Sequence, residues 1–197
     1  MPANRIVDHI NALASGQIRV DVHAAGVNFP DSLIIRNLYQ FKPELPFSPG
    51  GEIAGVISAL GEGVEGLRVG DAVMALCGHG GFAQQALVEA AKAVRIPAGV
   101  AMDMAASFTM VYATSYHGLA DRAQLKAGES LLVLGAAGGV GLAAVEIGKA
   151  LGARVIAAAS SDEKLEVCRA QDLSVGLDSL AYPHGPGIDR GPARARP

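Results

Sequence analysis

The first half of the chain consists of short segments in which apolar and polar positions alternate. Residues 17–27 follow this pattern from Ile18 to Ala24, which predicts a half-buried strand. Residues 28–37 carry Pro30, which suits the first turn of a short helix. Further short strands with glycine-rich connections are predicted at 52–64, 71–76 and 82–90. This density of strands and turns is typical of an antiparallel, barrel-like β domain.

The pattern changes near Pro97 to longer apolar stretches. Residues 101–121 contain few helix-breaking residues and are predicted to be helical. The run 131–134 is continuously apolar, as expected of a strand buried on both faces of a parallel sheet. Residues 153–159 predict a second such strand, and apolar residues at helical spacing between the two predict a helix that ends at Gly152.

One more helix is predicted after the second strand. Ser160 and Glu163 form a capping-box pattern at its start, and the helix should end near Gln171. The resulting order of strand, helix, strand and helix implies right-handed parallel crossovers. Residues 172–197 are broken by glycine and proline, and we expect them to be disordered.

A glycine-rich loop, 135–141, joins the first parallel strand to its helix and is the strongest chemical signal in the chain. Backbone N–H groups at a helix N-terminus bind a pyrophosphate, and glycine lets the phosphates approach. The order of strand, loop, helix and strand is the context that a dinucleotide-binding motif requires. The alternative is a glycine-rich turn that binds nothing. The residues expected to bind the cofactor here are Ala137, Gly138, Gly139, Val140 and Gly141.

The end of the second parallel strand favours NADPH over NADH. NAD-selective folds place an acidic residue there for the ribose 2′-hydroxyl, but this strand runs into Ser160 and Ser161. Their hydroxyls and the Lys164 ammonium would suit a 2′-phosphate. The acids Asp162 and Glu163 lie close by, and the alternative is that Ser160 only caps the helix while Lys164 is solvated.

Composition excludes several other classes. The net charge of −3 disfavours a nucleic-acid partner, and no apolar stretch reaches the ~20 residues of a membrane span. The two cysteines, Cys77 and Cys168, lie far apart and are expected to be buried free thiols. His23 and His117 have no partner at metal-ligand spacing and are expected to be structural. Without a signal sequence, a cytoplasmic location is expected.

Four segments together resemble the medium-chain dehydrogenase/reductase superfamily, and more narrowly its NADPH:quinone oxidoreductase (zeta-crystallin-like) branch. They are AAGVNFPD, PFSPGGEIAGVI, GDAVMA and GAAGGVGLAAVEIGKALGARVIAAAS. The resemblance implies an α/β fold with a GroES-like catalytic domain at 1–97, of which 1–16 match poorly. A partial Rossmann NADP-binding domain follows at 98–171.

The resemblance also implies a reductase without zinc. The positions where zinc alcohol dehydrogenases of this superfamily carry catalytic ligands correspond to Asn28, Gly51 and Met110, and none of these side chains is a zinc donor. A quinone or activated enone would then accept hydride directly from the nicotinamide. No metal is expected.

Three further site residues come from the resemblance. Asn28 and Tyr39 are implied to line the cleft beside the nicotinamide and the substrate, and Asn28 would hold the carboxamide or the substrate oxygen. Thr114 is implied to face the cofactor. The alternatives are a loop cap for Asn28, packing for Tyr39 and a hydroxyl bonded back to its own helix for Thr114.

Both ends of the chain depart from the family pattern. Relatives continue after Gln171 with more sheet strands, so the resemblance implies a truncated sheet of about two strands. The apolar faces of 131–134 and of the helix after Gly138 would then lack partners. Relatives dimerise through this domain, and we expect the usual dimer edge to be lost. Residues 172–197 would be an aberrant tail.

Two hypotheses of function follow. The first is a zinc-independent, NADPH-dependent oxidoreductase that acts on a small-molecule quinone or enone. The second is a non-catalytic truncated fragment or a GroES-like interaction module without reductase activity.

Overall fold

The computed structural model describes residues 13–170 and 177–181. The chain divides into two compact units, with the boundary between Met110 and Val111. This boundary is later than the 97/98 division expected from the sequence. The reason is packing, because Ala105 and Ala106 of helix α3 (Met102–Ala106) are buried against Ala54 of the first unit.

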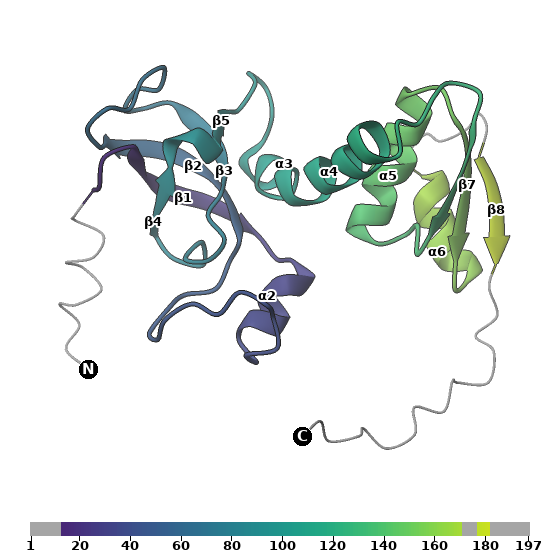
Figure 1. The fold of residues 1–197 in the computed structure, drawn as a ribbon, viewed down its shortest axis with the longest axis horizontal. Helices are drawn as coiled ribbons and strands as arrows, with labels where there is room; N and C mark the ends of the chain where they lie inside the picture. Colours follow the sequence, from purple (N-terminus) through teal and green to yellow (C-terminus); the bar gives the residue numbers. More distant parts are fainter. Residues whose placement is uncertain (1–12, 171–176, 182–197) are drawn as a thin grey trace. The chain divides into compact units, whose positions relative to one another are not determined.

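The first unit contains an antiparallel sheet of five strands in the order β4-β1-β2-β3-β5 (Figure 1). Every neighbouring pair runs antiparallel, as predicted. The last and shortest strand was not predicted from the sequence. The strands are β1 (Gln17–Gly26), β2 (Glu52–Leu60), β3 (Ala72–Leu76), β4 (Gln85–Glu89) and β5 (Ala93–Arg95).

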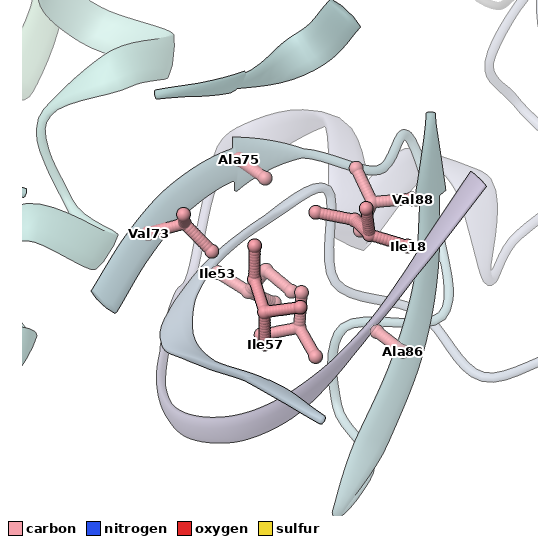
Figure 2. Close-up of a cluster of buried hydrophobic side chains, with 8 residues drawn as sticks. Ile18, Ile53, Ile57, Val73, Ala75, Ala86 and Val88 are labelled. Carbon is pink, nitrogen blue, oxygen red and sulfur yellow. The ribbon is translucent and has the colours of Figure 1, made fainter. Parts of the chain in front are cut away.

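The core of this unit lies inside the curve of the sheet. Figure 2 shows side chains from β1, β2, β3 and β4 pointing toward one another. Ile18, Ile53 and Ile57 are almost completely buried, and burial of each such side chain stabilises the fold by about 1.5–3 kcal/mol. The labelled members of the cluster are Ile18, Ile53, Ile57, Val73, Ala75, Ala86 and Val88.

The helices confirm most of the sequence prediction. Helix α2 (Phe29–Ile34) forms in the segment expected to contain it, with proline in its first turn. The helical stretch expected at 101–121 is interrupted after α3 and continues as α4 and a π-helical segment. The remaining helical elements are η1 (Ala90–Lys92), α4 (Thr109–Tyr116) and η2 (His117–Arg122). None of the helices among the described residues combines the length and the apolar character needed to cross a membrane.

The second unit contains a parallel sheet in the order β6-β7-β8, with helices α5 and α6 against the same face of it (Figure 1). Parallel pairing of the three strands confirms the predicted parallel direction of the sheet. The third strand corrects the expectation that 172–197 lack order, and the remainder of that segment lies outside the described residues. The elements are β6 (Ser130–Leu134), α5 (Gly139–Ala150), β7 (Arg154–Ala159), α6 (Asp162–Arg169) and β8 (Leu177–Ala181).

Strand β6 is buried on one face only, so the prediction of burial on both faces is wrong. Val133 is buried, whereas Leu132 and Leu134 are 54% and 69% exposed. The helices cover the side on which Val133 lies. In α5 the buried residues are Ala143, Val145 and Gly148, and Val140 at its start is 47% exposed. The sequence-based expectation of unpartnered apolar faces therefore holds for this strand and for the first turn of this helix.

Candidate functional site

A cavity of about 690 Å³ lies in the second unit, where β6 and β7 end. In open α/β sheets, ligands bind outside the carboxyl ends of the strands. The glycine loop forms one part of the lining and the end of β7 with α6 forms the other. The lining residues are Leu134, Gly135, Ala137, Gly138, Ala158, Ala159, Ser160, Lys164 and Val167.

The loop fits tightly under the start of α5. Gly138 is the N-cap of α5, and its N–H donates to the Gly135 carbonyl oxygen at 3.0 Å. The next amides, at Gly139, Val140 and Gly141, occupy the first turn, where helical N–H groups have no intrahelical partner. A Cβ at Gly141 would lie 2.4 Å from the Gly135 carbonyl oxygen. Only glycine fits there, and the first-turn amides are the donors that the loop offers.

Two adjacent serines at the end of β7 have different roles. Ser160 and Lys164 line the cavity, and the Lys164 Nζ donates to the Ser160 Oγ at 2.9 Å. Ser161 is the N-cap of α6, and its Oγ accepts from the Lys164 N–H at 3.4 Å. Its hydroxyl also bonds to the Glu163 carboxylate, which lowers the pKa of that glutamate. The predicted capping box on Ser160 is therefore wrong by one residue, and Ser161 does not line the cavity.

Helix α4 is joined to α5 by two side chains that the sequence analysis did not single out. The buried Ser115 hydroxyl donates to the Val140 carbonyl oxygen at 2.9 Å. The Tyr112 hydroxyl donates to the Glu146 carboxylate, and burial together with this carboxylate raises the pKa of Tyr112 to about 12. Thr114 is exposed on the same helix and does not line the cavity.

In the first unit, Asn28 stands at the N-cap of α2. Asp31 completes a capping box, and its Oδ2 accepts from the Asn28 N–H at 2.8 Å. The other Asp31 oxygen accepts from the Gly50 N–H at 3.1 Å, so both oxygens of this buried side chain are hydrogen-bonded. Asn28 therefore caps the start of α2, which is the alternative role given for it above.

The Asn28 side chain also bonds to Glu52, a residue with no signal in the sequence beyond its position after Gly51. The Asn28 Nδ2 donates to Glu52 Oε1 at 2.8 Å, and the Met110 N–H donates to Oε2 at 2.8 Å. A Cβ at Gly51 would lie 3.4 Å from the Met110 Cε. Asn28, Gly51 and Met110, the positions that correspond to zinc ligands in the alcohol dehydrogenases, therefore lie around the buried Glu52 carboxylate.

Both cysteines are free thiols, and among the described residues no cysteine or histidine belongs to a group that could hold a metal ion. Cys77 donates its thiol to the Gly50 carbonyl oxygen, and burial, with the nearby charges of Asp31 and Glu52, raises its pKa to about 11. Cys168 is buried, and its thiol pKa is also raised. No group of three or more His, Cys, Asp or Glu residues within 13–170 and 177–181 is arranged to hold a metal ion.

The remaining predicted residues are placed as follows. Tyr39 is half-buried in the segment after α2. His23 is exposed on β1. His117 is exposed, and its Nδ1 lies 2.8 Å from the Asp121 Oδ2. The geometry gives neither histidine a role at the two sites described above.

Comparison with known proteins places these features in a family. The alcohol dehydrogenase GroES-like domain matches residues 14–98. The quinone oxidoreductase-like protein 2 homolog of Nematostella vectensis is 39% identical over 168 residues, which are 84% of this chain and 46% of that protein. The chain spans about half the length of the curated relatives that it matches.

Solved structures of oxidoreductases are similar to this chain over most of its length. The Escherichia coli quinone oxidoreductase complexed with NADPH is 32% identical with a TM-score of 0.79, covering 87% of this chain and 52% of that one. The CurK enoyl reductase is 30% identical with a TM-score of 0.78, covering 87% and 53%. Both structures share the fold of this chain, a GroES-like unit with a partial Rossmann-like unit, and the chain spans about half of each.

Proposed function

Since the chain belongs to the medium-chain dehydrogenase/reductase family over the span that it shares with these relatives, we propose that it is a zinc-independent reductase that uses NADPH to reduce a quinone or an activated enone. The observation that carries the proposal is the cavity at the ends of β6 and β7, lined by the glycine loop on one side and by Ser160 and Lys164 on the other.

The diphosphate would bind the first turn of α5. The partial positive charge of a helix N-terminus favours an anion, and the first turn contains no acidic residue. The available donors are the amides of Gly139, Val140 and Gly141, because the Gly138 amide is already bonded within the loop. Gly138 lines the cavity and adds no side chain to it.

The 2′-phosphate would bind Ser160 and Lys164. These two groups are already 2.9 Å apart and line the same cavity. Asp162 and Glu163 are exposed and do not line it. An ammonium group with a hydroxyl suits a phosphate dianion better than a ribose hydroxyl, so NADPH should bind more tightly than NADH.

The acceptor would be an electron-poor carbonyl compound. Bound NADPH supplies the hydride, and the residues of the chain orient the partners. Asn28 and Tyr39 are the residues proposed to contact the nicotinamide or the acceptor. Relatives of both kinds support this substrate class, since one is described as a quinone oxidoreductase and another as an enoyl reductase.

Purified chain mixed with NADPH and p-benzoquinone tests the proposal. We expect loss of the reduced-nicotinamide absorbance that depends on both enzyme and quinone, and a slower reaction with NADH. Methyl vinyl ketone in place of the quinone distinguishes the two acceptor classes. A chain that folds cooperatively but neither oxidises NADPH nor is stabilised by it would instead be a non-catalytic module.

A further inference from the structure

Ser115 of α4 is a buried serine whose hydroxyl bonds outside its own helix. A serine inside a helix often bonds back to a carbonyl three or four residues earlier. The Ser115 Oγ instead donates to the Val140 carbonyl oxygen of α5 at 2.9 Å, and only 5% of the Ser115 surface is exposed. Both residues belong to the second unit. The bond therefore holds the Val140 carbonyl from outside α5.

The Val140 carbonyl also has a partner in its own helix. In an α-helix each carbonyl accepts from the N–H four residues later, and Val140 is the second residue of α5. A carbonyl oxygen has two lone pairs, so the Ser115 hydroxyl binds the second one. The bond is therefore not needed to satisfy a buried carbonyl, and its effect falls on the peptide group to which that carbonyl belongs.

The same peptide group carries the Gly141 N–H, one of the first-turn amides proposed above to bind the diphosphate. A donor on the oxygen of a peptide polarises its N–H and strengthens the bond that this N–H makes by roughly 10–30%. The loop fixes this peptide from the other side, since a Cβ at Gly141 would lie 2.4 Å from the Gly135 carbonyl oxygen. The Gly141 N–H is thus held by the loop and polarised by Ser115 before any ligand binds.

Two further contacts hold α4 against α5. The Tyr112 hydroxyl donates to the Glu146 carboxylate, and it keeps its proton at neutral pH because burial and this carboxylate raise the pKa of Tyr112 to about 12. A Cβ at Gly139 would lie 3.2 Å from the Val111 Cγ1, so the first turn of α5 lies close to α4. Of the two hydrogen bonds between these helices described here, only that of Ser115 reaches a peptide with a proposed diphosphate donor.

We propose that Ser115 is a positioning residue, which aligns and polarises the Gly141 N–H for the diphosphate through the Val140 carbonyl. This inference rests on the proposed reductase function and deepens it, because it adds to the glycine loop a residue from the helix that precedes it in the chain. It concerns the second unit alone. Tyr112 holds the same two helices together about 7.5 Å further along α5, since Glu146 follows Gly141 by five residues.

Ser115→Ala and Tyr112→Phe separate these two roles, because each removes one hydroxyl between the same two helices. We expect S115A to raise the Kd for NADPH by roughly three- to tenfold. Y112F is the matched control and should raise it by less than about twofold. Calorimetric titration measures both effects. Ser115→Thr, which keeps the hydroxyl, should restore the affinity of the parent chain, and thermal melts establish that each variant is folded.

Adenosine 2′-monophosphate distinguishes an effect on the loop from general damage to the cavity. This ligand carries the phosphate proposed to bind Ser160 and Lys164 but has no diphosphate, so S115A should change its Kd by less than about twofold. In NMR spectra of the isotope-labelled chain without ligand, the Gly141 amide signals should move upfield in S115A, because loss of the donor reduces the polarisation of that peptide. Y112F should leave these signals in place.

Four results would overturn the inference: S115A with the Kd of the parent chain for NADPH, a loss of affinity in Y112F as large as that in S115A, equal weakening of NADPH and adenosine 2′-monophosphate, or unmoved Gly141 signals in S115A. If S115T does not fold, the comparison of S115A with Y112F decides. A parent chain that binds neither NADPH nor adenosine 2′-monophosphate contradicts the proposed function, which is a different result from a parent that binds both and is indifferent to Ser115.

Discussion

Replacement of Lys164 by methionine should remove the preference for NADPH. The substitution keeps the length of the side chain and its contact with the cavity but removes the ammonium that lies 2.9 Å from the Ser160 Oγ. A hydrogen bond to a charged group contributes about 1.5–3 kcal/mol. Lys164 is exposed, so screening by solvent reduces its contribution to about 1–1.5 kcal/mol, or roughly a tenfold change in Kd.

Titration of K164M and the parent chain with NADPH and NADH, by calorimetry or nicotinamide fluorescence, measures this effect. The Kd for NADPH should rise about tenfold, while the Kd for NADH should change by less than about twofold, because NADH has no 2′-phosphate. Added salt should weaken NADPH binding to the parent more than to K164M. Lys126→Met, at an exposed lysine of the same unit outside the cavity lining, is the control.

Equal loss of affinity for both cofactors would refute this reasoning, since it would mean that Lys164 acts on the shape of the cavity. Unchanged affinity for NADPH would refute it as well and would place the 2′-phosphate elsewhere. An effect of K126M as large as that of K164M would indicate general electrostatic attraction.

Further predictions concern the loop, a surface ion pair and a thiol. Gly141→Ala should abolish cofactor binding measured by calorimetry, because the new methyl group would lie 2.4 Å from the Gly135 carbonyl oxygen. The pKa of Asp71 is lowered, chiefly by its hydrogen bond with Arg95. Its contribution to stability is therefore present above the unfolded pKa near 3.8 and is lost as the pH falls through the lower folded pKa. Asp71→Asn should make the melting temperature depend less on pH over that acid range. Cys77, with a thiol pKa of about 11, should react with iodoacetamide at neutral pH about a hundredfold more slowly than free cysteine, as measured by mass spectrometry of its peptide.

The elements around the glycine loop were predictable from the sequence because local signals determine them. A continuous apolar strand, a glycine loop and a helix with a C-terminal glycine identify β6, α5 and Gly152 without tertiary information. The short strand β8 was missed, since it lies in a segment rich in breakers and its pairing with β7 is a long-range contact. Burial of β6 on one face was likewise invisible, because its leucines are equally apolar on both faces.

The polar groups of each unit were predicted less well, for reasons of geometry. Ser160 and Ser161 are chemically identical neighbours, and only the backbone conformation decides that Ser161 caps α6 while Ser160 faces the cavity. Glu52 carries no local pattern at all. Its hydrogen-bond partners come from positions 28 and 110, which only the folded chain brings together.

The most direct test of the central claim is to follow backbone amide NMR signals of the full chain as NADPH is added. We predict that the largest shifts fall on Gly139, Val140 and Gly141 in the first turn of α5, with smaller shifts at Ser160 and Lys164. Signals in this turn that do not move while NADPH binds, or no response anywhere at saturating NADPH, would contradict the assignment of the glycine loop as the diphosphate site.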